Sequence, residues 1–214
     1  MLFDLDGTLI DSAPDLAGTA NEMRVERGLA PLPFERLRER AGSGARGMLA
    51  VAFGLGPAEG GYAALRDEFH ARYERRMLAA TNVFDAIAPV LAALDERGLA
   101  WGIVTNKALR FAEPMASALG LLPRAAVLVG GDSTPHLKPH PAPLLEAARR
   151  LALAPARCVY VGDDARDIAA GRAAGMAAWA AAWGYLGSEG DPHGWGADAV
   201  LGGPHELLHF LELA

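Results

Sequence analysis

The first eleven residues read MLFDLDGTLID, a short apolar run at residues 1–3 followed at once by Asp4 and Asp6. An apolar run of this kind predicts a strand, and Gly7-Thr8 after it predicts a turn that leaves the sheet. Because side chains alternate along an extended chain, Asp4 and Asp6 point the same way. Two acids on one side of a strand end indicate a nucleophile with an acid/base partner, or half of a metal site. An Asp-rich turn without chemistry is the alternative for this stretch alone.

Composition and charge narrow the class of protein. The chain has 214 residues, and its hydrophobic fraction of 51% is ample for a buried core. Its net charge of −6, without a basic stripe, argues against a nucleic-acid partner. The single cysteine, Cys158, excludes an internal disulfide and is typical of a protein in the reducing cytoplasm. We therefore expect a cytoplasmic protein. We further expect it to be a monomer or a homodimer.

Membrane and leader segments are not expected. No apolar stretch approaches the roughly 20 residues that span a bilayer, so we expect no membrane partner. We also expect no signal peptide before Asp4. Because the opening strand is short, we expect the natural protein to carry a few more residues upstream of Met1.

The pattern of residues 12–81 differs from that of the rest of the chain. Apolar side chains recur there at helical spacing, without strand-like alternation. From residue 82 onward strands and helices alternate, with strands predicted at 99–104, 125–129, 157–161, 176–181 and 197–201, and helices at 86–97, 110–119, 138–151, 165–174 and 206–212. Such alternation is typical of a parallel sheet covered by helices on both faces. The sequence therefore predicts an α/β fold in which a Rossmann-like parallel-sheet core, residues 1–11 and 82–214, is interrupted by an all-helical insert, residues 12–81.

Polar residues follow the predicted strands where each one ends. Besides the first pair of acids, they are Thr105, Asn106, Asp163 and Asp164, with Asp167 one helical turn further on and Lys138 in a loop before a helix. The carboxyl ends of parallel strands meet at one rim of the sheet, so these groups can share a pocket. Clustered carboxylates need a cation, and hard oxygen ligands without a Cys/His cluster favour Mg²⁺. A lysine and a threonine suit phosphoryl oxygens, so the set indicates phosphoryl transfer.

These residues resemble the four motifs of the haloacid dehalogenase-like phosphatase superfamily, in order and spacing, across nearly the whole chain. The first motif corresponds to DLDGT at residues 4–8, the second to Thr105, the third to Lys138 before a proline, and the fourth to residues 162–164 with Asp167. The resemblance implies the fold of that superfamily, with residues 12–81 as its helical cap domain. The cap is similar to that of the phosphoglycolate phosphatase-like branch.

The resemblance also implies a catalytic role for each strand-end acid. Asp4 would attack phosphorus and form an aspartyl-phosphate, and Asp6 would protonate the leaving alcohol and then deprotonate the hydrolytic water. Mg²⁺ would be held by the side chains of Asp4 and Asp163 and by the backbone carbonyl of Asp6. Asp167 would lie behind these ligands without binding the metal directly. For Asp164 two roles stay open, an outer-sphere contact with the metal and the capping of the next helix.

The phosphoryl group and the rest of the substrate would be held by other residues. Thr105 and Lys138 would bind the phosphoryl oxygens, and Asn106 could donate a further hydrogen bond. The stretch AGSGAR at residues 41–46 resembles the substrate loop of the cap, with Gly44 and Arg46 as substrate-binding residues. Arg46 could pair with a substrate carboxylate, or it could be a solvated arginine at a helix start.

Two substrates, both carrying a carboxylate, are considered. A small phosphorylated metabolite such as phosphoglycolate is favoured by the branch of the family. N-acetylmuramic acid 6-phosphate, with its lactyl carboxylate, is the alternative, because residues 104–107, 110–114 and 195–198 look like the phosphatases of cell-wall recycling that hydrolyse it.

Three rival functions share part of the pattern. A receiver-like phospho-switch also joins acids, Mg²⁺, a threonine and a lysine on a parallel sheet, but it lacks the helical insert and the second acid, Asp6. Dehalogenases of the superfamily lack an acid at that position too. Sugar phosphomutases share all four motifs. Residues 8–12 are expected to be the hinge through which the cap opens.

Overall fold

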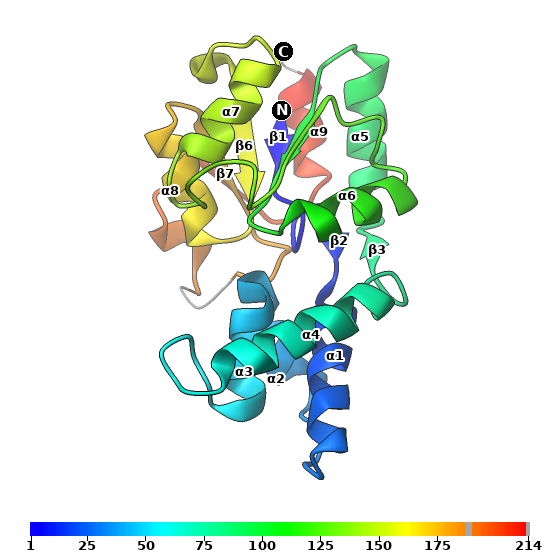
Figure 1. The fold of residues 1–214 in the computed structure, drawn as a ribbon. Helices are drawn as coiled ribbons and strands as arrows, with labels where there is room; N and C mark the ends of the chain where they lie inside the picture. Colours follow the sequence, from blue (N-terminus) through cyan, green and yellow to red (C-terminus); the bar gives the residue numbers. More distant parts are fainter. Residues whose placement is uncertain (187–189, 213–214) are drawn as a thin grey trace.

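The parallel sheet forms the centre of the computed structural model, which describes residues 1–186 and 190–212 (Figure 1). Within the described residues the sheet has the order β5-β4-β1-β6-β7-β8, and every neighbouring pair is parallel. Its strands are β1 (Leu2–Phe3), β4 (Gly102–Val104), β5 (Val127–Val129), β6 (Val159–Gly162), β7 (Ala177–Ala181) and β8 (Ala199–Leu201). The predicted α/β fold with a parallel, Rossmann-like core is confirmed.

Helices cover both faces of this sheet, and the alternation of buried side chains along the strands explains why. In β1 the fully buried Leu2 packs with helices α7 (Ala142–Arg150) and α8 (Ala165–Ala173) on one face. The next residue, Phe3, packs on the opposite face with α5 (Ile87–Glu96), α6 (Leu109–Ala118) and α9 (Glu206–Glu212). Strands buried on both faces read as continuous apolar runs, which is how they were recognised in the sequence.

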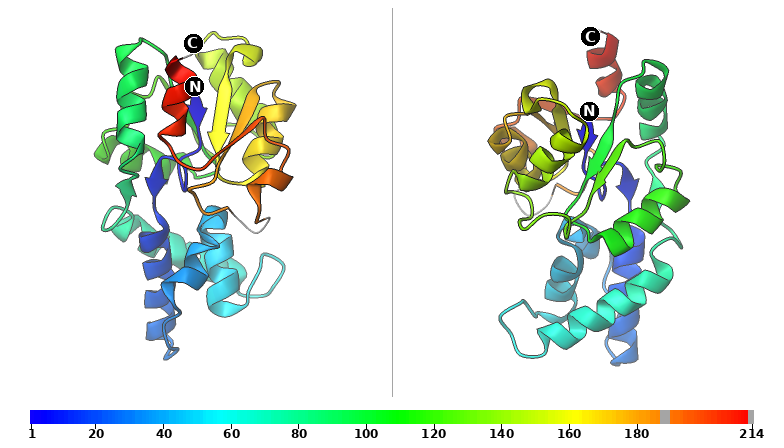
Figure 2. Two further views of the ribbon diagram at one scale, coloured as in Figure 1. Left: turned by 180° about the vertical axis from the view of Figure 1, so that it is seen from behind. Right: turned by 45° about the horizontal axis from the view of Figure 1, so that its top comes forward.

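A group of helices follows β2 (Ile10–Asp11) and lies beyond the carboxyl ends of the strands (Figures 1 and 2). The helices are α1 (Ala13–Glu26), α2 (Phe34–Arg38), α3 (Gly44–Phe53) and α4 (Tyr62–Arg76), with the 3₁₀ turn η1 (Ala41–Ser43) before α3. They pack through buried apolar residues such as Met23, Leu37 and Phe69. The predicted helices of the insert are therefore present, whereas its assignment as a separate domain spanning residues 12–81 stays a prediction.

Two short strands connect the helical group to the sheet. β2 pairs in antiparallel fashion with β3 (Asn82–Val83), and Ile10 lies opposite Val83. The sequence analysis missed this pair because two-residue strands carry no detectable alternation. The chain thus enters the helical group through β2 and leaves it through β3, and these two connections run side by side. Residues 8–12 lie here with Thr8 and Ser12 fully buried, and their role as a hinge stays a prediction.

Asp15 fastens the end of the helical group to its beginning. This fully buried carboxylate in α1 accepts hydrogen bonds at Oδ2 from the N–H groups of Ala80 and Thr81, at 3.0 and 2.9 Å, and from the Thr81 hydroxyl, at 2.8 Å. Arg76 Nε lies 3.5 Å from Asp15 Oδ1. A buried charge with this many partners is costly to leave unpaired, so Asp15 fixes where the chain returns to the core.

Some element boundaries differ from the predicted ones. The predicted helix at 138–151 begins only at Ala142, because Pro139 and Pro141 disfavour the helical conformation at the residues that precede them, Lys138 and His140. The predicted strand at 99–104 is shorter, Gly102–Val104. Among the described residues no helix combines the length and the apolar character that crossing a bilayer requires.

The fastening by Asp15 can be tested by its effect on stability. We expect Asp15→Ala to lower the free energy of unfolding by about 3 kcal/mol, because it removes the partner of several buried donors. Glu22→Ala is the matched control, since Glu22 also pairs with Arg76 but is 51% exposed; it should change stability by about 0.5 kcal/mol or less. Urea denaturation monitored by circular dichroism measures both. Equal losses for the two variants would contradict this role of Asp15.

Candidate active site

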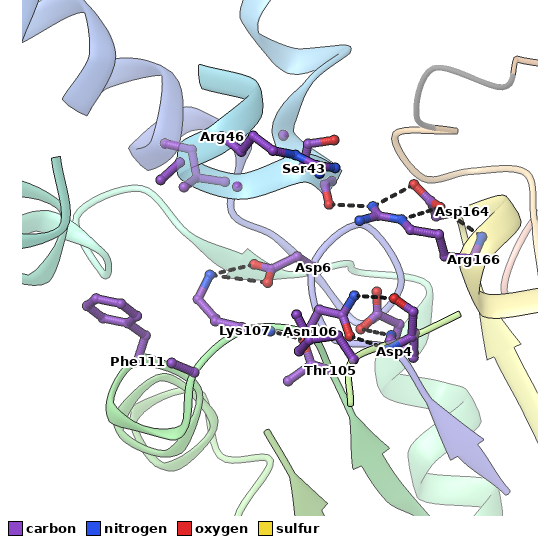
Figure 3. Close-up of a pocket in the computed structure, with 18 of the residues that line it drawn as sticks. Asp4, Asp6, Ser43, Arg46, Thr105, Asn106, Lys107, Phe111, Asp164 and Arg166 are labelled. Atoms are coloured by element: carbon purple, nitrogen blue, oxygen red, sulfur yellow. Dashed lines mark hydrogen bonds and ion pairs between the residues drawn. The ribbon is translucent and has the colours of Figure 1, made fainter. Parts of the chain in front are cut away.

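The topology of the sheet brings the predicted site residues together. Because β1 lies between β4 and β6, the residues that follow these three strands, Asp4, Thr105 and Asp163, are neighbours at one rim. They line a cavity of about 550 Å³ between the rim and the helical group, and Figure 3 shows side chains from both parts pointing into it. The cavity is also lined by Asp6, Gly44, Arg46, Asn106, Lys138, Asp164 and Asp167, so it contains every residue that the sequence analysis assigned to the site.

Asp163 is held in a tight cradle. The Thr8 hydroxyl donates to its Oδ1 (3.0 Å), and the Tyr185 N–H donates to its Oδ2 (2.7 Å). Two glycines make room for it: a Cβ at Gly7 would lie 2.2 Å from Asp163 Oδ2, and one at Gly184 would lie 2.2 Å from Asp163 Cβ. Real Cβ atoms do not approach other atoms so closely. The glycine in the first motif therefore serves a carboxylate that is distant in sequence.

Lys138 is the cation at the centre of the carboxylates. Its Nζ lies 2.9 Å from Asp4 Oδ1 and 2.7 Å from Asp167 Oδ1. The same ammonium donates to the carbonyl of Val104 (3.0 Å) and to the hydroxyl of Tyr160 (2.7 Å). Burial would lower the pKa of Lys138, but the two carboxylates outweigh burial and raise it. Lys138 therefore stays charged and keeps Asp4 and Asp167 apart.

The acids of this cluster carry more negative charge than one lysine neutralises. Burial, together with the repulsion from Asp167, raises the pKa of Asp4 to about 6 against the opposing effect of Lys138. Burial, and then the charges of Asp4 and Asp167, raise the pKa of Asp163 well above its ordinary value. Raised pKa values of this origin indicate a site that favours a further cation.

A divalent metal ion fits this donor set. One carboxylate oxygen each from Asp4, Asp163 and Asp167 lies within 4.8 Å of the other two. Asp4 Oδ1 is buried and accepts no hydrogen bond from the described residues, its contact with Lys138 being an ion pair. An all-oxygen set of this kind suits a hard cation such as Mg²⁺.

Asp167 and Asp164 close the start of helix α8. Asp164 is its N-cap: its side chain accepts from the Arg166 N–H, and the Asp167 side chain accepts from the Asp164 N–H in a capping box. Burial would raise the pKa of Asp164, but the Arg166 guanidinium outweighs burial and lowers it. Asp164 therefore caps α8, and its outer-sphere contact with the metal stays a prediction. Since both oxygens of Asp167 have partners, a place behind the metal ligands suits it.

Asn106 orients Lys138. Its side-chain amide donates to the Lys138 carbonyl (3.0 Å) and accepts from the Lys138 N–H (2.9 Å). Thr105 is buried at the rim, and its Oγ1 accepts from the Lys107 N–H, 3.1 Å away. The strand-end loop after β4 thus holds the loop that carries Lys138.

The helical group closes the cavity from the other side (Figure 3). Gly44, at a φ of 55°, begins α3, and Arg46 lies exposed in the first turn of that helix and faces the cavity. The carbonyl of Gly42 accepts from Arg166 of α8, 2.9 Å away. A cation of the core thus contacts the predicted substrate loop directly.

Lys107 and Tyr185 are among the site residues that were missed in the sequence. Lys107 Nζ lies 2.9 Å from Asp6 Oδ1, with only 9% of its side chain exposed. One signal could have found it: the chain contains only two lysines, Lys107 and Lys138, and both line the cavity. Tyr185 was missed because it follows β7 in a loop without any motif, and only the fold brings it to Asp163.

The fold and the site together define an α/β enzyme with a carboxylate-rich site at the rim of a parallel sheet. The family model of the haloacid dehalogenase-like hydrolases matches residues 1–175, and the chain belongs to that family. The predicted hydrolase family is confirmed.

Similar proteins have been named as phosphatases. The chain is 43% identical over 214 residues to the N-acetylmuramic acid 6-phosphate phosphatase of Pseudomonas aeruginosa, covering 100% of this chain and 95% of that protein. It is 48% identical over 207 residues to the phosphoglycolate phosphatase of Xanthomonas campestris pv. campestris, covering 97% and 93%. Among solved structures, a predicted phosphoglycolate phosphatase from Haemophilus somnus 129pt superimposes with a TM-score of 0.86 at 26% identity, over 98% of this chain and 96% of that one.

The cradle of Asp163 yields a test of the metal site. We expect Gly184→Ala to weaken Mg²⁺ binding by about 10- to 100-fold, because its Cβ would displace Asp163. Gly194→Ala is the matched control, since nothing lies within 4 Å of the added Cβ. Isothermal titration calorimetry with MgCl₂ measures both affinities. Unchanged affinity in Gly184→Ala would show that Asp163 does not hold the metal.

Proposed function

We propose that the protein is a Mg²⁺-dependent phosphomonoesterase that acts through an aspartyl-phosphate on Asp4. The observation that carries this proposal is the buried cluster of Asp4, Lys138 and Asp163 at the strand ends, with a second acid, Asp6, held beside it. The named phosphatases among its relatives support the same reaction class.

Each step of the proposed reaction has a group in the cavity to perform it. A carboxylate oxygen of Asp4 attacks phosphorus, the bond from phosphorus to the leaving oxygen breaks, and Asp6 gives that oxygen a proton. In the second half Asp6 takes a proton from water, the water oxygen attacks phosphorus, and the bond to Asp4 breaks. Asp4 and phosphate are restored.

Charge stabilisation comes from the surrounding groups. Mg²⁺ would be held by the side chains of Asp4 and Asp163 and by the backbone carbonyl of Asp6. The ion would neutralise charge on the phosphoryl oxygens. Thr105 lies at the same rim and can donate its hydroxyl proton to a phosphoryl oxygen. Lys138 offsets the charge of Asp4, so that the nucleophile can receive an anionic phosphoester.

Both candidate substrates carry a carboxylate. The cavity of about 550 Å³ has room for either of them beside the phosphoryl group. The Pseudomonas relative favours N-acetylmuramic acid 6-phosphate, whereas the Xanthomonas relative favours phosphoglycolate. A phosphate-release screen of small phosphomonoesters that includes both compounds tests the proposal. It also separates hydrolysis from a phosphomutase, which releases no stoichiometric phosphate, and from a phospho-switch, which does not turn over.

The nucleophile is tested directly by substitution. We expect hydrolysis of p-nitrophenyl phosphate only in the presence of Mg²⁺, and its loss by at least about 1000-fold in Asp4→Asn, because an amide oxygen is a poor nucleophile. Asp85→Asn serves as the control, since Asp85 is exposed and does not line the cavity. Release of p-nitrophenolate measures the rates. Activity without metal, or an active Asp4→Asn variant, would refute the mechanism.

The carboxylate preference is tested at the cap loop. We expect Arg46→Ala to raise KM for a carboxylate-bearing phosphoester by about 10- to 100-fold, the value of a charged hydrogen bond, and to change KM for p-nitrophenyl phosphate little. Arg36→Ala removes an exposed charge of α2 outside the cavity and should change neither. Equal effects of Arg46→Ala on KM for both substrates would show that Arg46 does not determine substrate specificity.

A further inference from the structure

The ammonium of Lys107 has three acceptor atoms within the protein. Its ammonium donates to both carboxylate oxygens of Asp6, at 2.9 and 3.1 Å, and to the hydroxyl of Tyr73, at 3.0 Å (Figure 3 shows the Asp6 contacts). A lysine ammonium has three N–H donors and no acceptor. Although Lys107 lines the cavity, its ammonium is already engaged by Asp6 and Tyr73, so its role in this arrangement is to hold Asp6.

The backbone of Lys107 is fixed on both sides. Its N–H donates to Thr105 Oγ1 at 3.1 Å, and its carbonyl accepts from the Gly131 N–H at 2.8 Å. Gly131 is required for this close approach, because a Cβ there would lie 2.3 Å from the Asn106 carbonyl oxygen. The starting point of the lysine side chain is therefore set by the sheet.

Tyr73 reaches Lys107 from the other part of the fold. It lies on α4 and is 2% exposed, with its ring stacked on Phe69 and edge-on to Phe111 of the core helix α6. Its hydroxyl donates weakly to Met115 Sδ, 3.7 Å away. The Tyr73 hydroxyl thus occupies a defined position only while α4 lies against α6.

Burial makes this arrangement responsive to the position of α4. Only 9% of the Lys107 side chain is exposed. A buried ammonium that loses one of its acceptors seeks another partner or water, and its remaining hydrogen bonds change. The orientation of Asp6 is thereby coupled to Tyr73.

We propose that Lys107 is a positioning residue that aims the carboxyl group of Asp6 at the leaving oxygen, and that Tyr73 completes this arrangement when α4 lies against the core. The proposal rests on the proposed function, in which Asp6 protonates the leaving group. Proton delivery is then efficient only with the helical group closed over the substrate.

The leaving-group dependence of kcat/KM tests this proposal. The probes are 4-nitrophenyl, 4-chlorophenyl and phenyl phosphate, which have similar shapes but leaving groups of increasing basicity. Nitrophenolate departs without a proton, whereas phenolate needs one. We expect Lys107→Met to lower kcat/KM for phenyl phosphate by about 10- to 100-fold and for 4-nitrophenyl phosphate by about threefold or less, because general acid catalysis contributes about 10²- to 10⁴-fold. Arg149→Met, which removes a cation that is 72% exposed, is the control and should leave all three values unchanged.

A double-mutant cycle tests the part assigned to Tyr73. Tyr73→Phe removes one hydroxyl and retains the packed ring, so it keeps the experiment informative if Lys107→Met does not fold. We expect the same steepening of leaving-group dependence in Tyr73→Phe, smaller in size, and no further effect of Tyr73→Phe in the Lys107→Met background. Lys107→Arg, which keeps the charge in a larger group, should restore part of the loss.

The outcomes separate the two levels of the proposal. If Lys107→Met and Tyr73→Phe lower kcat/KM equally for all three esters, or leave it unchanged, the positioning role is overturned while the phosphatase function stands. Additive effects of the two substitutions would overturn the link through Tyr73. If the unaltered protein hydrolyses none of the esters with Mg²⁺ present, the proposed function is overturned and the positioning role with it.

Discussion

The rest of the site depends on the mutual repulsion of buried carboxylates at the end of the central strand. Asp4, Asp163 and Asp167 can remain close only because Lys138 lies among them and because the donors Thr8 and Tyr185 hold Asp163. Gly7 and Gly184 leave just enough room for this cluster. The excess negative charge that remains is what suits the site to a divalent cation and, with it, an anionic phosphoester.

The same cavity joins the two parts of the fold. Among the described residues, core cations contact groups of the helical region at three places: Lys107 at Tyr73, Arg166 at the carbonyl of Gly42, and Arg110 at the His70 ring, 3.1 Å away. The paired strands β2 and β3 carry the chain between the parts next to the acids of the first motif. A movement of the helices would therefore change the surroundings of the acids directly.

Much of the fold and of the site could be predicted from the sequence. The apolar runs and the polar residues that end them placed Asp4, Thr105 and Asp163 at one rim, because parallel strands share their carboxyl edge. Local pattern could not show Tyr185, whose role depends on a contact 22 residues away in the chain. Lys107 was overlooked because a single lysine after a strand has no spacing to mark it. The late start of α7 has a local cause, since the prolines at 139 and 141 keep the residues before them out of the helical conformation.

The central claim is that Asp4 carries the phosphoryl group during turnover. Acid quenching of the enzyme during steady-state hydrolysis, followed by proteolysis and mass spectrometry, tests it most directly. The account predicts a phosphorylated peptide from the start of the chain with the modification on Asp4, and none in the Asp4→Asn variant. Turnover without any phosphorylated peptide, or with the phosphoryl group on another residue, would contradict it.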